Sequence, residues 1–311
     1  MNTEKKGMLA AAVAYSIFGF SYLFAKMALS IDGVDPMILL CSRSTVSFVV
    51  LNLLVLTKVF KVHFKGKNIW PAILLGFLQP LIFSTLENYG VNFTTTAFTG
   101  LVASIAPVFS SILGVFLLGE KPNWKQWLCI VLSISGVIIV SLGGDGGNNT
   151  LAGCLCLVGA YLVTALYSNL SRKFSQGFTS IELTYVMFTV GFIGFSTMTF
   201  ATHGMQTISI ILTAAGNKSF IIACLYLGIL SAIAAYILIN YAVSKLPVSR
   251  ATIFSSFTTI ISVLSGIIIM KDPFTWVSIV AFILILFGVY GVNRFADKNE
   301  FPSRPRAKGR G

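Results

Sequence analysis

The sequence predicts an all-α membrane protein with ten transmembrane helices, arranged as two inverted five-helix repeats with both termini inside (N-in/C-in). Three observations lead to this fold: a very apolar composition, matching residues at a constant offset, and basic residues concentrated on one side. Of the 311 residues, 56% are apolar and 10% are charged, whereas a soluble domain carries about 25% charged residues. With a mean hydropathy of +0.86, the chain is expected to lie mostly in lipid.

Ten apolar runs have the length of about 20 residues that an α-helix needs to cross the hydrocarbon core of a bilayer. Proline and tryptophan lie near the ends of several runs, where a missing amide proton does least harm and an amphipathic ring meets the headgroups. No secretory cleavage pattern accompanies the first run, which is therefore expected to be retained. The runs cover residues 7–29, 36–58, 69–90, 95–118, 124–142, 152–170, 179–202, 219–241, 248–270 and 274–293.

Matching residues at an offset of 152 indicate an internal duplication. Examples are Tyr15 with Tyr167, Asn88-Tyr89 with Asn240-Tyr241, Trp124 with Trp276, and Gly136 with Gly288. Because each repeat holds five crossings, an odd number, the second repeat must be inverted relative to the first. The predicted units are a first repeat at 1–146, an inverted second repeat at 147–296, and a disordered basic cytoplasmic tail at 297–311.

The basic residues fix the predicted orientation. If the N-terminus is inside, 18 of the 22 Lys and Arg residues lie in inner segments, three lie in outer segments, and Arg43 lies within a run. This bias is typical of cytoplasmic loops, so the net charge of +12 does not indicate a nucleic-acid surface. We expect an integral protein of the plasma (inner) membrane with both termini cytoplasmic.

Several short strings add a family resemblance. They are Phe18-Gly19-Phe20-Ser21 before Lys26, Glu87-Asn88-Tyr89-Gly90, Pro107-Val108, and Leu117-Leu118-Gly119-Glu120-Lys121. In this order and on ten apolar runs, they resemble the EamA-type branch of the drug/metabolite transporter (DMT) superfamily over residues 7–293. The resemblance implies ten helices, an inverted repeat, and movement of small organic solutes, often by export. The second half departs from the pattern, with Thr259 in place of the Pro and Asp272 in place of the Glu.

Ionisable groups within membrane runs are costly, so each is a candidate for function. Arg43 lies well inside the second run, and its planar guanidinium could hold a carboxylate or phosphate, or pair structurally with a neighbouring helix. Glu87 could exchange a proton for a cationic substrate. Glu87 could instead pair with Lys26, at the same expected depth, as an outer gate or a static strut, or be an exposed helix end.

Polar and aromatic groups in the runs complete the predicted substrate-binding set. Aromatic walls with a few hydrogen-bonding groups suit a pocket for amphipathic metabolites, although the same side chains also serve as ordinary packing between membrane helices. The predicted substrate-binding residues are Tyr15, Phe18, Tyr22, Arg43, Gln79, Glu87, Asn88, Tyr167, Tyr236 and Asn240. The three charged candidates, Lys26, Arg43 and Glu87, all belong to the first half. We therefore expect the first half to hold the groups that recognise the substrate.

These features predict a secondary transporter, of the exporting kind, that moves a small organic metabolite such as an amino acid or a drug-like solute by alternating access. Two alternatives remain: a passive facilitator or channel, and a membrane-embedded lipid-processing enzyme, which would need clustered nucleophiles that the sequence does not offer. No enzymatic activity, cofactor or metal site is expected. The expected partners are a small-molecule substrate, the lipid bilayer and a coupling ion, protons or another, with no nucleic acid. The protein is expected to be a monomer or a homodimer.

Overall fold

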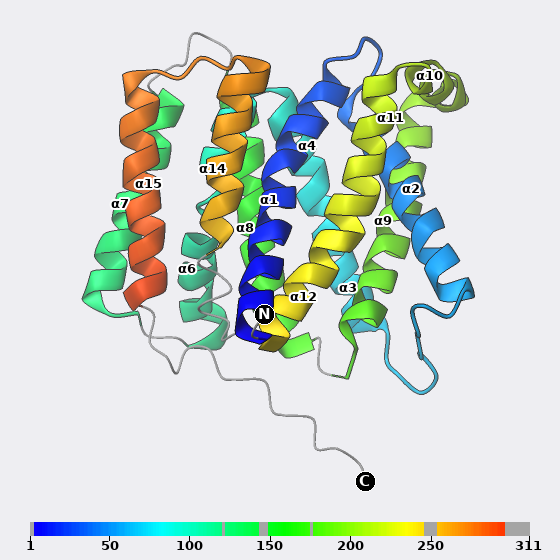
Figure 1. Cartoon of the computed structure of the whole chain (residues 1–311), viewed down its shortest axis with the longest axis horizontal. Coiled ribbons are helices and arrows are strands. Elements are labelled where there is room, and N and C mark those ends of the chain that lie inside the picture. Colours follow the sequence, from blue (N-terminus) through cyan, green and yellow to red (C-terminus); the bar gives the residue numbers. More distant parts are fainter. Residues whose placement is uncertain (1–2, 120–121, 143–148, 175–176, 246–253, 296–311) are drawn as a thin grey trace.

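The computed structural model describes residues 3–119, 122–142, 149–174, 177–245 and 254–295, and helices dominate this part of the chain. The helices run up and down in one bundle, with the start of α1 at the bottom of Figure 1. We call the end of the bundle where α1 begins the N-terminal face, and the other end the opposite face. The predicted tail at 297–311 lies outside the described residues.

Each predicted run contains helix, and several runs contain more than one helical segment. In the first half these are α1 (Thr3–Leu29), α2 (Pro36–Leu56), α3 (Trp70–Gly76), η1 (Phe77–Ile82), α4 (Phe83–Asn92), α5 (Thr96–Ala103), α6 (Ala106–Leu118) and α7 (Trp124–Leu142). In the second half they are α8 (Leu151–Phe174), α9 (Ser180–His203), α10 (Gln206–Ala215), α11 (Lys218–Leu225), η2 (Tyr226–Ala234), α12 (Ala235–Lys245), α14 (Ser255–Ser265), η3 (Gly266–Met270) and α15 (Trp276–Phe295).

Eight helices of the described part are long and apolar enough to cross a membrane, from the first at Lys5–Leu29 to the last at Lys218–Ile239. The helical stretches Ser256–Met270 and Trp276–Val292 are apolar but shorter. The protein is thus an all-α membrane protein. The beginning of the ninth predicted run, residues 248–253, lies outside the described residues.

Two of the membrane runs are interrupted at matched positions. A π-helical segment, η1, separates α3 from α4, and η2 separates α11 from α12. Within η1, Gln79 has an extended backbone (φ −139°, ψ 115°). Its offset mate, Ser231, lies within η2. Such interruptions release backbone and side-chain groups from regular helix packing and often mark functional sites.

The helices exchange neighbours between the two halves. Helix α1 packs against α12 and α14 of the second half, whereas α8, the offset mate of α1, packs against α4 and α6 of the first half. Helix α2 packs along its mate α9, and α7 packs along its mate α15 (Figure 1). The largest apolar core contains residues of both halves, among them Phe98, Leu157 and Ile285.

The structure places a helix where the sequence analysis expected only an outer loop. Helix α10 lies on the opposite face (Figure 1) and packs against α2, α9 and α11. Its buried residues are Thr207 and Ala214, while Ile208 and Leu212 are exposed. An apolar run of ten residues is too short to cross a bilayer, so α10 has the character of an interfacial helix.

Candidate functional site

Two opposite charges, Arg43 on α2 and Glu87 on α4, lie near each other among the membrane helices. Both are half-buried, and they are close enough to attract each other electrostatically. No ion pair within 4.0 Å joins these two residues, and the Arg43 guanidinium donates no hydrogen bond to another described residue. Since unpaired charges in an apolar bundle are costly, the arrangement is suited to a ligand that contacts both.

A close approach of two helices sets the position of Arg43. A Cβ atom on Gly228 of η2 would lie 2.9 Å from both the Arg43 carbonyl oxygen and Val46 Cβ, so a larger residue cannot stand at this position. The Ser47 hydroxyl, at 2.9 Å, donates to the Gly228 carbonyl oxygen and ties the two backbones together. The second half therefore forms one wall beside the arginine of the first half.

A chain of hydroxyl groups leads from Glu87 to α1. The Tyr161 hydroxyl, on α8, lies near the Glu87 carboxylate. The Tyr161 hydroxyl also contacts the Tyr22 hydroxyl at 3.1 Å. Both tyrosines are buried, and the Tyr161 ring packs edge-on against Phe83. The two buried tyrosine hydroxyls therefore form a polar wall beside the carboxylate.

A second polar contact lies around Tyr236 of α12. The Gln79 side-chain amide donates to the Tyr236 hydroxyl at 3.1 Å, while the Gln79 Oε1 atom is buried without a hydrogen-bond partner. The Tyr236 ring packs edge-on against Phe18, with the ring centroids 5.7 Å apart. Tyr236 also lies close enough to Arg43 for electrostatic interaction. The unpartnered amide oxygen is an acceptor that a bound solute could satisfy.

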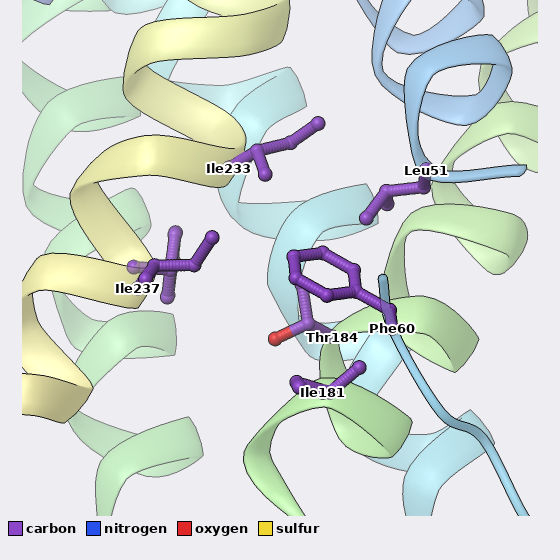
Figure 2. A pocket seen from close by; sticks show the side chains of 7 residues that line it. Leu51, Phe60, Ile181, Thr184, Ile233 and Ile237 are labelled. Carbon is purple, nitrogen blue, oxygen red and sulfur yellow. The ribbon is translucent and has the colours of Figure 1, made fainter. Parts of the chain in front are cut away.

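A small pocket of about 30 Å³ lies beside Tyr236. Figure 2 shows the Phe60 ring reaching from an extended segment toward Ile233 and Ile237, with Leu51 and Thr184 beside it. This volume has room for about one water molecule, so the helices around the pocket would have to separate to admit an organic solute. The residues that line it are Leu51, Phe60, Ile181, Thr184, Ile233, Tyr236 and Ile237.

The other predicted site residues have different surroundings. Tyr15 is half-buried and its ring lies 6.5 Å from that of Phe18. Tyr167 donates to the sulfur of Met187 at 3.5 Å and lies near Tyr236. Asn88 is buried and donates to the Ser84 carbonyl oxygen of its own helix, while its Oδ1 atom has no hydrogen-bond partner. Asn240 lies in α12, and its side chain is outside the described part of the chain.

The structure does not pair Lys26 with Glu87, which was one of the alternatives for Glu87. The Lys26 ammonium donates instead to the carbonyl oxygens of Val91, Asn92 and Thr94, at 2.9, 3.0 and 2.6 Å. These carbonyls lie at and just after the end of α4, where helix carbonyls lack partners and the helix dipole attracts a cation. Lys26 therefore ties α1 to the end of α4 and leaves Glu87 available for other contacts.

Replacing Lys26 with methionine should destabilise the protein by about 2 kcal/mol or more, because three charge-assisted hydrogen bonds are lost and carbonyl oxygens stay buried without a donor. Thermal unfolding in detergent measures the effect. Lys218, an exposed residue at the start of α11, is the matched control, and its replacement with methionine should leave the unfolding temperature nearly unchanged. Equal unfolding temperatures for both variants would contradict this role of Lys26.

The sequence analysis missed a further charge in the bundle, Glu182 on α9. Glu182 is buried and forms an ion pair with Lys67 at 2.6 Å. It also completes a capping box with Thr179, the N-cap residue of α9. The Thr-x-x-Glu pattern of residues 179–182 is the signal that identifies the cap, but nothing in the sequence connects it with Lys67.

The family profile that matches this chain and two similar proteins of Bacillus subtilis are all described as transporters. The profile of the EamA-like transporter family matches residues 5–142 and again residues 151–294. The uncharacterized transporter YcxC of Bacillus subtilis is 29% identical over 96% of each chain. The uncharacterized transporter YetK of the same organism is 25% identical, over 90% of this chain and 84% of its own.

Two more distant matches extend the comparison. A protein of Streptantibioticus cattleyicolor named "Probable terminal-alkyne amino-acid exporter" is 24% identical over 78% of each chain. A solved crystal structure superposes with a TM-score of 0.60 at 18% identity, over 94% of this chain and 98% of that one. The structural match shows that the fold is shared.

Proposed function

Because the chain belongs to the EamA-like transporter family, within the drug/metabolite transporter superfamily, we propose that it is a secondary transporter that exports a small organic solute across the plasma membrane by alternating access. That it is a membrane transporter follows from the family. The observation that carries the finer proposal is the close but unpaired charges of Arg43 and Glu87. Two charges held apart between helices of both halves form a site that a solute can complete.

The proposed architecture has ten membrane crossings in two inverted repeats, 1–146 and 147–296, with both termini cytoplasmic. The exchange of neighbours supports it, since α1 contacts α12 while its mate α8 contacts α4. One family profile also matches each half in turn, at residues 5–142 and 151–294. In such an architecture the two halves rock about a site near the membrane midplane. The N-terminal face is then the cytoplasmic side.

We propose an amino-acid-like zwitterion as the substrate. Arg43 offers a planar pair of donors that matches a carboxylate, and Glu87 offers a carboxylate for an ammonium group. Tyr22 lies near Glu87, Tyr236 lies near both charges, and the Phe18 ring packs against Tyr236. An aromatic or aliphatic side chain of the solute would pack against these rings.

Counterflow in proteoliposomes tests the function. Vesicles loaded with unlabelled phenylalanine or leucine should accumulate the labelled amino acid from outside, and protein-free vesicles should not. A panel of nucleosides and cationic drugs extends the test to other solute classes. Equilibration without accumulation would indicate a passive facilitator, and no movement of any solute would contradict the transporter proposal.

Proton coupling is proposed to depend on Glu87. Glutamine has nearly the same shape as glutamate but no titratable proton, so the Glu87→Gln variant should transport at a rate that changes less than about twofold between pH 5.5 and 8.5. The wild-type rate should change about tenfold over this interval if one proton is exchanged per solute. Initial rates in proteoliposomes measure both profiles. A pH profile of the variant that parallels the wild type would remove Glu87 from proton coupling.

A further inference from the structure

The segment between α2 and α3, residues 57–69, crosses the N-terminal face beside the pocket, and we call it the strap. Its side chains alternate in exposure: Phe60, Val62 and Phe64 are half-buried, whereas the side chains between them, Lys61 and His63, are exposed. This period of two is that of an extended chain with one apolar face. The apolar face of the strap is turned toward the bundle, and the basic face is turned toward water.

Aromatic contacts hold the strap against the bundle. Phe60 packs in an apolar cluster with Leu51 and Ile233. The ring of Phe64 lies 6.1 Å from that of Tyr185 on α9. Because α2 and α9 both border the pocket, these contacts connect the strap to the helices that would have to separate for the pocket to open at this end.

One buried carboxylate holds the other end of the strap. The Oε2 atom of Glu182 accepts from the Lys67 ammonium at 2.6 Å, and its Oε1 atom accepts from the His63 backbone amide at 3.0 Å. The Lys67 side chain is partly exposed, whereas the Glu182 side chain is 3% exposed. Lys67 also lies over the Phe178 ring, 5.7 Å from its centroid. A buried carboxylate with two strap donors forms a strong but separable contact.

The strap contributes Phe60 to the wall of the pocket. Phe60 lines the pocket together with Tyr236, and the Tyr236 hydroxyl accepts the hydrogen bond of Gln79. The strap residue Phe60 therefore shares the pocket with Tyr236, which lies close enough to Arg43 for electrostatic interaction. If the strap moved away, the path from this face to Tyr236 would lose its apolar plug.

We propose that the strap is the gate at the N-terminal face, with Phe60 as its plug and the Lys67–Glu182 ion pair as the latch that holds it shut. The proposal rests on the transport function proposed above and adds the device that closes one side of the site. The two ends of the bundle differ in the segment that lies at the position of the strap. The stretch that corresponds to the strap in the second half includes most of α10, a helix on the opposite face, so each end can open separately.

Thiol labelling of a buried pocket residue tests the gate. Ile233 lines the pocket and is 5% exposed, so a cysteine at this position reports access from the N-terminal face. In the Ile233→Cys protein, in sealed vesicles, a membrane-impermeant maleimide is applied to that face. Adding Lys67→Gln or Glu182→Gln should raise the labelling rate about tenfold, because a charge-assisted hydrogen bond is lost. Glutamine at position 182 can still complete the capping box of α9.

Three controls isolate the latch. The chain without Ile233→Cys gives the background of the free cysteines of the chain. Lys61→Gln removes the same charge from an exposed strap position, and Lys67→Arg keeps the cation, so both should label at the parent rate. If neither Lys67→Gln nor Glu182→Gln labels faster than Lys61→Gln, the latch is overturned.

Transport assays on the same vesicles separate this proposal from the function on which it rests. Faster labelling of the two latch variants supports the gate even if no solute in the panel is transported, in which case the transport proposal is the one that fails. Transport with wild-type rates and unchanged labelling in both latch variants would overturn the gate and leave the transporter in place.

Discussion

Replacing Arg43 with glutamine is expected to lower kcat/KM for zwitterionic solutes about 100-fold or more. The carboxylate of the solute would lose its charged partner, and truncating one partner of a buried charge pair costs about 2–5 kcal/mol. In addition, Glu87 would lose the cation that attracts it. Initial rates of counterflow in proteoliposomes, measured over a range of solute concentrations, give the ratio directly.

Solutes that lack one charge make the test specific. Phenethylamine has the ammonium group of phenylalanine but no carboxylate, so its transport should fall by less than about threefold in the Arg43→Gln variant. Arg43→Lys keeps the charge without the planar pair of donors and should lose about tenfold for phenylalanine. If Arg43→Gln slowed the amine and the amino acid equally, Arg43 would be a structural residue and not the carboxylate partner.

The positions of most helices could be predicted from the sequence, because length and apolarity alone decide whether a helix can cross a bilayer. The run predicted at 124–142 coincides with α7, and the run at 36–58 ends only two residues after α2 does. Neither the length nor the apolarity of a run predicts where a π-helical turn lies. Pro80 signals an irregularity in its run, but η2 contains no proline, so its interruption has no comparable signal in the sequence.

The candidate site could be predicted only as a set of residues, without their partners. Depth in the membrane suggested that Lys26 faces Glu87, but the carbonyl oxygens at the end of α4 hold Lys26 instead. The latch between Lys67 and Glu182 connects residues that are 115 positions apart. Such a contact depends on how α9 packs beside the strap, and neither apolar periodicity nor a local motif contains that information.

The second prediction concerns the interface of α7 and α15, which joins the ends of the two halves. Gly288→Ala should destabilise the protein by about 2–3 kcal/mol through overpacking. A Cβ atom at this position would overlap the Ser133 hydroxyl oxygen and would lie 2.7 Å from the Cys129 carbonyl oxygen. Because a carbonyl oxygen cannot turn away as a side chain can, the two helices would have to separate, which would also strain the hydrogen bond from Ser133 to the Ile285 carbonyl oxygen.

Thermal unfolding in detergent should show this loss as a decrease of roughly 5 °C or more in Tm. Gly159→Ala, in α8, is the matched control, since its added Cβ would lie 3.5 Å from Leu86 and in ordinary contact. That variant should keep or raise the Tm, because alanine is favoured over glycine in a helix by about 1 kcal/mol. A Gly288→Ala protein as stable as Gly159→Ala would mean that α7 and α15 can move apart without cost, and the close packing of the two halves at this interface would then be incorrect.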